Sequence, residues 1–396
     1  MGQVQQLTPA QQQYMVNQKA LQANLQARQH VLANAFEVKQ QVDSQTFVPS
    51  SRNTYDISGT NVGIVKGFLV KVAATIKNNH LTESVALTPF GIANLIKQVT
   101  YYDPNNQRHI ETTGWHLAMV NTIKNGRPFG SSTATDSPIK YGDNYDIIEA
   151  PETVAAGATA NVVMHFWIPL AYSDTDLSGA VFANVAQSKQ RLRLEFATNS
   201  TAFVGAAENP LEAVYQGAGA ADCELEEISY TCYQHYLDQL PMMDGQYVVP
   251  AIDLSTLYLL ENTVQAGLTP NADFAVQYGN LYRYLSTIAI FDNGGTFAAK
   301  GADVNYLAQR TANFSDYRKA SPDSWNLETR KLIGTDLPPS VYLAESRQRP
   351  IYTLQTGNVT FVMNPKTVNT NARLIMAYES FVTATNLTNI GTISTS

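Results

Sequence analysis

The chain has 396 residues, enough for two domains that each bury a hydrophobic core of ordinary size. Only 15% of the residues are charged and the formal net charge is −7, which gives no support to nucleic-acid binding, because that requires a basic patch. A surface so poor in charge is typical of a protein that neighbouring molecules cover.

No basic segment followed by an apolar stretch opens the chain, so no secretion signal is expected. The most apolar run, VVMHFWIPLAY (162–172), is interrupted by His165 and Pro169. It is far shorter than the roughly 20 residues that span a bilayer. We therefore expect synthesis in a reducing cytoplasm, where Cys223 and Cys232 stay free thiols.

Residues 1–45 are rich in Gln and Ala and are predicted to form an N-terminal helical arm. Thr8-Pro9 is a typical helix start, with an N-cap threonine followed by proline at the first helical position. The arm also carries three leucines at helical spacing and two cations: Leu21, Leu25, Leu32, Lys19 and Arg28. Two interpretations stay open, a helix packed on its own or a neighbouring subunit, and an arm that contacts an anionic membrane surface.

Residues 46–240 are predicted to form a first β-domain, because short β-type runs alternate with turn sequences. In GFLVKVAATI (67–76), Phe68, Val70 and Val72 alternate with residues of the opposite face, as in a strand with one face in a core. Two more elements follow, the strand IKQVTYY (96–102) and the helix GWHLAMVNTIKNG (114–126), which has a glycine at each end.

The same elements recur in residues 241–381, which are predicted to form a second β-domain. At an offset of 189 positions TLYLLENTVQ (256–265) matches 67–76, so Leu257 and Leu259 are predicted core residues equivalent to Phe68 and Val70. The other matches, in chain order, are LSTIAIFDNGG (285–295) with 96–106, ADVNYLAQRTANF (302–314) with the helix 114–126, GNVTFVMNP (357–365) with NVVMHFWIP (161–169), and TNARLIMAYES (370–380) with SKQRLRLEFAT (188–198).

Short strands, frequent turns and duplication predict an all-β chain of two tandem jelly rolls, each with one short inserted helix. Residues 382–396 are polar and are predicted to be a flexible C-terminal tail.

Motifs for chemistry are absent from the sequence. The six histidines form no HxH or HExxH pair, and no phosphate-binding loop or nucleophile motif occurs. The acidic cluster CELEE (223–227) is best explained as the start of a strand with an exposed edge, and His165 as a packed or interface residue. We therefore expect no metal, no cofactor and no enzymatic activity.

Short blocks in both halves and at the C-terminus carry a family resemblance. They include NVGIVKGFLVKV (61–72), YYDPNNQRH (101–109), DSPIKYGD (136–143), SKQRLRLEFA (188–197), YQGAGAADCE (215–224), NLYRYLSTIA (280–289), QRTANFSD (309–316), NPKTVN (364–369) and GTISTS (391–396). These blocks resemble the major capsid protein of the tectiviruses, which are icosahedral double-stranded DNA phages with an internal membrane. In the arm, QVQQLTPAQQ (3–12) and NLQARQ (24–29) are similar to the same family.

The resemblance implies a structural protein of the virion, synthesised in the host cytoplasm. It implies homotrimers with a roughly hexagonal outline that tile the facets of the shell above the internal membrane, with the N-terminal arm facing that membrane. Neighbouring trimers, penton proteins and minor facet or cement proteins would be its partners, without direct contact to nucleic acid. Segments 128–134, 297–302 and 318–346 would form outward-projecting tower loops.

A competing hypothesis is a double jelly roll that binds or cleaves glycans. It requires exposed aromatic side chains such as Trp115, Trp167 or Trp325 along one groove, together with paired carboxylates.

Overall fold

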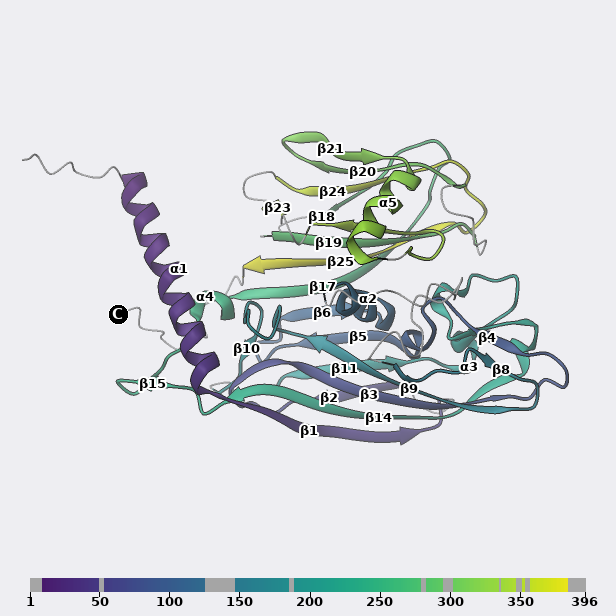
Figure 1. Ribbon diagram of the computed structural model, residues 1–396, viewed down its shortest axis with the longest axis horizontal. Coiled ribbons are helices and arrows are strands. Elements are labelled where there is room, and N and C mark those ends of the chain that lie inside the picture. Colours follow the sequence, from purple (N-terminus) through teal and green to yellow (C-terminus); the bar gives the residue numbers. More distant parts are fainter. Residues whose placement is uncertain are drawn as a thin grey trace, which may run out of the picture.

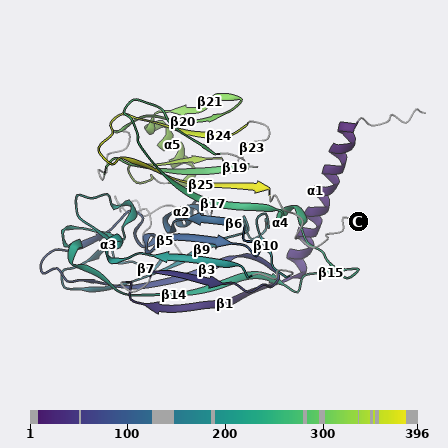
Figure 2. The ribbon, with the colours of Figure 1, turned by 180° about the vertical axis from the view of Figure 1, so that it is seen from behind.

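The computed structural model describes residues 9–49, 53–124, 147–184, 189–278, 283–294, 302–334, 336–346, 351–352 and 357–383. These residues form two β-sandwiches stacked on each other, with one long helix across one end of the strands (Figure 1). The view from behind shows the same arrangement (Figure 2).

The first sandwich has two facing sheets. One sheet contains β1 (Phe36–Phe47), β14 (Cys223–Asp238), β3 (Ile64–Asn78) and β9 (Thr159–Pro169) in that order, extended by β7 (Ile147–Glu149) and by β10 (Val181–Phe182), which pairs with β3. The other contains β2 (Thr54–Ser58), β11 (Arg191–Phe196), β5 (Ile96–Tyr102) and β6 (Arg108–Thr112). Smaller strands are β4 (Val85–Leu87), β8 (Thr153–Val154), β12 (Phe203–Val204), β13 (Tyr215–Gln216), β15 (Met242–Met243) and β16 (Gln246–Tyr247).

The second sandwich repeats this plan. One sheet contains β17 (Thr256–Ala266), β25 (Arg373–Thr383), β19 (Arg283–Asp292) and β22 (Val341–Glu345), with β23 (Ile351–Tyr352) beside β19. The other contains β18 (Phe274–Tyr278), β24 (Val359–Pro365), β20 (Val304–Thr311) and β21 (Phe314–Ala320).

Both sandwiches have the same strand order. When the eight main strands of each are numbered along the chain, the two sheets of both sandwiches have the orders 1-8-3-6 and 2-7-4-5. This is the double Greek-key arrangement of a jelly roll, so the predicted all-β class and the two tandem jelly rolls are confirmed.

The predicted alignment of the two halves matched strands that are not equivalent, with slips of one or two strands. It matched β3 with β17, although β3 is the third main strand of its jelly roll and β17 is the first. The match of β5 with β19 pairs the fourth main strand with the third, whereas the matches of β9 with β24 and of β11 with β25 slip by one strand in the opposite direction. A two-residue period is common to all half-buried strands, so it identifies a strand without identifying its place in the fold.

One of the two predicted inserted helices is correct. The helix expected at 114–126 is α2 (Gly114–Lys124), whereas 302–314 forms strand β20 and the start of β21. The second helix is α5 (Pro322–Ile333), which occupies the place of α2 between the fifth and sixth main strands. The tower loop expected at 318–346 therefore contains a helix and strand β22, while 128–134 and 297–301 lie outside the described residues.

The two predicted sets of core residues have different outcomes. Phe68, Val70 and Val72 are fully buried, as expected. Leu257 and Leu259 are only half-buried, whereas their neighbours Tyr258 and Leu260, on the other face of β17, are fully buried against the first jelly roll. The expected equivalence with Phe68 and Val70 therefore does not extend to the degree of burial.

The N-terminal arm is shorter than predicted. Helix α1 spans Pro9–Asn34, and the residues after it form β1, an integral strand of the first jelly roll. Two four-residue helices, α3 (Asn199–Ala202) and α4 (Ala251–Leu254), and the 3-10 turns Gly91–Leu95, Pro210–Glu212 and Ala218–Asp222 complete the fold. At the other end, β25 reaches Thr383, and the remainder of the predicted tail lies outside the described residues.

Candidate functional site

Arg28 anchors helix α1 to the short helix α4. Arg28 donates from Nε and Nη2 to the two carboxylate oxygens of Asp253, at 2.5 and 2.6 Å, and its Nη2 lies 3.2 Å from Asp176. Asp253 belongs to α4 and is almost fully buried. Its hydrogen bond raises the pKa of the Arg28 guanidinium. The paired geometry is the strong, charge-assisted kind.

Two more residues of the same helix face complete the contact. Asn24 is buried, donates from Nδ2 to Asp253 Oδ1 at 2.9 Å and accepts from the backbone N–H of Ile252 at 2.9 Å. Val31 is fully buried in a small apolar cluster against which Leu32 packs. Residues 24, 28 and 31 follow helical spacing, so one face of the C-terminal half of α1 carries the whole contact.

The five predicted arm residues therefore separate into two groups. Arg28 and Leu32 face the protein: one is ion-paired and the other packs on an apolar cluster. Lys19 is exposed, as are Leu21 (47%) and Leu25 (50%). None of the helices in the described residues combines the length and apolar character needed to cross a bilayer.

A groove of about 820 Å³ runs between α1 and the second jelly roll. Leu21, Leu25 and Arg28 line it on the helix side. Arg283 lies on the other side, with its guanidinium 4.5 Å from the ring centroid of Phe381.

The two jelly rolls are joined by a continuous sheet and a buried charge cluster. Strand β6 of the first pairs in parallel with β17 of the second, and Arg108 crosses this seam to Glu261 at 3.0 Å. Lys124, at the end of α2, donates to the carbonyl of Tyr172 at 2.8 Å and lies 3.6 Å from the carboxylate of Glu379 on β25.

Glu379 is fully buried. Tyr258 Oη donates to it at 2.5 Å and Ser286 Oγ at 3.1 Å. A buried carboxylate is tolerated only when hydrogen bonds and a nearby cation compensate it, and here the cation comes from the other jelly roll. The cluster therefore couples the second jelly roll to helix α2 of the first.

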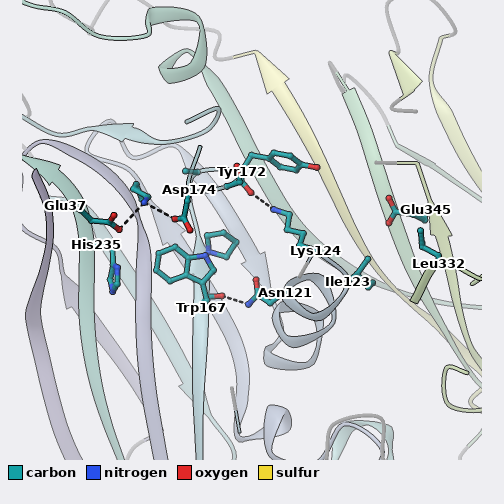
Figure 3. Close-up of a pocket in the computed structure, with 14 residues that line it drawn as sticks. Glu37, Asn121, Ile123, Lys124, Trp167, Tyr172, Asp174, His235, Leu332 and Glu345 are labelled. Carbon is teal, nitrogen blue, oxygen red and sulfur yellow. Dashed lines mark hydrogen bonds and ion pairs between the residues drawn. The ribbon is translucent and has the colours of Figure 1, made fainter. Parts of the chain in front are cut away.

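A cavity of about 620 Å³ opens beside this joint (Figure 3). The Lys66 ammonium lies 3.0 Å from Glu37 and 2.9 Å from Asp174. Burial lowers the pKa of Lys66, but the two carboxylates outweigh this effect and leave the pKa above its usual value. Trp167 and His235 both line the cavity, and their rings meet edge to face with 5.1 Å between the ring centroids. Burial lowers the pKa of His235.

The described residues contain neither a metal-binding cluster nor an activated cysteine. Within the described residues, no cluster of three or more His, Cys, Asp or Glu side chains could hold a metal ion. Cys223 and Cys232 are free and buried, and burial raises the pKa of Cys223 to about 11. Such a thiol stays protonated at neutral pH and is a poor nucleophile.

The positions of the three tryptophans exclude the glycan groove that the competing hypothesis requires. Trp115 and Trp325 are buried, the first in the core of the first jelly roll and the second in that of the other. Only Trp167 is partly accessible, so the three tryptophans do not line one groove.

Comparison with known proteins decides the family. The model of the P3 major capsid protein N-terminal domain matches residues 2–240, and that of the C-terminal domain matches residues 255–395. The chain belongs to the P3 major capsid protein family. It is 66% identical over 395 residues to the major capsid protein P3 of Enterobacteria phage PRD1, covering all of both chains.

Solved structures with little sequence identity share the fold. The crystal structure of the STIV MCP superposes with a TM-score of 0.62 at 10% identity, covering 88% of this chain and 97% of that one. An atomic structure of Sulfolobus Turreted Icosahedral Virus gives 0.61 at 10% identity, covering 88% and 91%. The chain is thus a structural protein of a phage capsid shell and not an enzyme.

Proposed function

We propose that this capsid protein assembles as a homotrimer with a pseudo-hexagonal outline, and that trimers tile the flat facets of an icosahedral shell above an internal membrane. The observation that carries this proposal is the identical strand order of the two jelly rolls. Three chains then present six similar sandwiches around a threefold axis. Such an object packs on a hexagonal lattice although it has only threefold symmetry.

The N-terminal half of α1 is the element proposed to face the membrane. It crosses the ends of the strands at one side of the molecule (Figure 1) and exposes Val16, Lys19 and Leu21, and Leu25 is exposed just beyond it. Apolar side chains beside a cation favour contact with an anionic lipid surface. The ion pair of Arg28 holds the other half of the helix on the protein, so the exposed half is presented in a fixed direction.

Hexagonal units tile a plane but do not close a shell at its fivefold vertices. Contacts with penton proteins at these positions, and with minor facet proteins between trimers, therefore belong to the same proposal.

The proposal is tested by analytical ultracentrifugation and negative-stain electron microscopy of the purified protein. We expect particles of three chains with a six-lobed outline. A protein that stays monomeric at high concentration would contradict it. Flotation with vesicles that contain anionic lipid tests the membrane contact, with L21S/L25S expected to weaken the binding and unchanged binding of that variant counting against it.

A further inference from the structure

The groove between α1 and the second jelly roll has an apolar wall. Leu21 and Leu25 of α1 line it together with Ile252 of α4, and these side chains are 47%, 50% and 38% exposed. The groove volume of about 820 Å³ lies within the range of ligand pockets. Three large apolar side chains that stay this exposed in one groove favour an occupant with an apolar part.

Arg283 brings an unneutralised cation to the same groove. It stands directly opposite Phe381 in the pairing of β19 with β25, and its guanidinium lies 4.5 Å from that ring centroid and 6.0 Å from the ring centroid of Tyr172. Among the described residues no acidic side chain forms an ion pair with it, and its Nε is buried without a hydrogen-bond partner. A guanidinium of this kind binds phosphate with two parallel hydrogen bonds.

The charges of the lining favour an anion. Lys19 of α1 is exposed and adds a second cation that has no ion pair within the described part of the chain. The two carboxylates of the lining, those of Asp176 and Asp253, both pair with Arg28. Lys19 and Arg283 are therefore left for a negative charge from outside. The cavity beside the joint lacks this excess, because its lining has three carboxylates for two lysines.

The groove lies at the end of the molecule that carries α1. The C-terminal end of β25, which includes Phe381, points toward α1 in both views (Figure 1 and Figure 2). In the function proposed above this end faces the membrane. The amphiphile that reaches the groove there is a phospholipid, which combines a phosphate with acyl chains.

We propose that the groove binds one anionic phospholipid of the internal membrane. The phosphate accepts hydrogen bonds from the Arg283 guanidinium beside the ammonium of Lys19, and an acyl chain lies along Leu21, Leu25 and Ile252. The inference rests on the membrane contact proposed above and deepens it by naming the lipid class and the residues that select it. A bound lipid bridges α1 and the second jelly roll, so it stabilises the docked helix.

The C-terminal segment of the same chain is the competing occupant. Strand β25 ends at Thr383, two residues after Phe381, and residues 384–396 follow directly. This segment consists mostly of Ser, Thr and Asn and has no charged side chain. It offers no acidic side chain to Arg283 and Lys19, so the charges of the groove favour the lipid.

Calorimetric titration of the purified protein with dihexanoylphosphatidylglycerol, kept below its micelle concentration, tests the site without a bilayer. We expect saturable binding of one lipid per chain. R283Q should bind about tenfold more weakly, because a hydrogen-bonded charge is lost, and K19Q about threefold more weakly, because that cation is exposed. The control R193Q removes the same charge from an arginine of β11 that does not line the groove, and it should bind normally. Unchanged binding of R283Q overturns the proposal.

Two other ligands separate the parts of the recognition. Inorganic phosphate lacks acyl chains and dihexanoylphosphatidylcholine lacks a net charge, so each should bind at least about tenfold more weakly. Equal affinity for inorganic phosphate overturns the lipid in favour of free phosphate. Equal affinity for the choline lipid overturns the selection of an anion.

Deletion of residues 384–396 tests the competing occupant. If the lipid occupies the groove, the deletion leaves the affinity for dihexanoylphosphatidylglycerol unchanged. Binding that occurs only after the deletion shows that the C-terminal segment fills the groove in the intact chain, and it overturns the proposal.

Hydrogen exchange on the unmodified protein covers the case in which R283Q fails to fold. At a lipid concentration 100 times Kd, a ligand that binds only docked α1 reduces its opening about 100-fold. Amides of residues 18–28 should exchange more slowly by that factor, and unchanged exchange overturns the proposal.

Vesicle flotation distinguishes this inference from the proposed function. Unmodified protein that floats with anionic vesicles but binds no soluble lipid keeps the membrane contact and overturns the groove site. Protein that binds the soluble lipid through Arg283 but does not float keeps the groove site and overturns the membrane contact.

Discussion

Replacing Asp253 with alanine should release helix α1 and leave both jelly rolls folded. The substitution leaves the Arg28 guanidinium, whose side chain is 18% exposed, with only Asp176 as a partner, and it leaves Asn24 without its acceptor. Breaking a buried ion pair costs about 3–5 kcal/mol. Since Arg28 keeps one partner and some solvent, we expect about 3 kcal/mol. Burial of Val31 and Leu32 still favours docking by about 2–4 kcal/mol.

Hydrogen exchange followed by mass spectrometry measures this local effect. A loss of about 3 kcal/mol corresponds to an opening equilibrium about 100-fold larger, since each 1.36 kcal/mol is tenfold. Amides of residues 24–34 should therefore exchange about 100-fold faster, with those of β3 unchanged. The control D176A removes a partner that is 30% exposed, so its effect should stay below about 1 kcal/mol. Unchanged exchange in α1, or faster exchange throughout the jelly rolls, would refute the reasoning.

Three further predictions follow from other parts of the molecule. V70D places a carboxylate at a fully buried position, which costs several kcal/mol, so a normal melting temperature and trimer yield would contradict the strand assignment. Deletion of residues 2–15 should preserve trimers and impair particle assembly; a truncated chain that fails to fold would show that these residues belong to the core. Burial lowers the pKa of His165 and of His235, so the free energy of unfolding should be constant above about pH 6.5, the pKa of histidine in the unfolded chain, and should fall as the pH drops below it. Urea unfolding of H165Q/H235Q should show a flatter pH dependence of this free energy than the unmodified protein. An unchanged pH dependence would count against the assignment.

The sequence was sufficient for the fold class but not for the correspondence between the two halves. Alternating apolar residues identified β3, β5, β9 and β17 as strands. Every strand of a sandwich shows this period, so the match could slip by one or two strands without losing its apparent quality. The same match assigned to Leu257 and Leu259 the full burial of Phe68 and Val70, although both leucines are only half-buried.

Helix α5 did have a sequence signal. Ser321 caps its first turn, Pro322 follows, and Gly334 ends it in the left-handed conformation at φ +79°. This is the expected order of helix start and stop residues. The helix was assigned instead to 302–314, where the match to α2 was taken from the wrong strand alignment.

The site depended on contacts that sequence spacing does not contain. Arg28 carries a positive charge in an arm, which favoured a membrane contact, but its partner Asp253 lies 225 positions away. Lys124 and Glu379 meet in the same way across the two jelly rolls. The spacing of Asn24 and Arg28, four residues apart on one helix face, was the signal that could have indicated a docked polar face.

The most direct test of the whole account is a cryo-electron microscopy reconstruction of the assembled shell. We predict capsomers of three chains, with six jelly rolls around each capsomer axis and α1 toward the interior of the shell. Capsomers built from any other number of chains, or α1 on the outer surface, would contradict it.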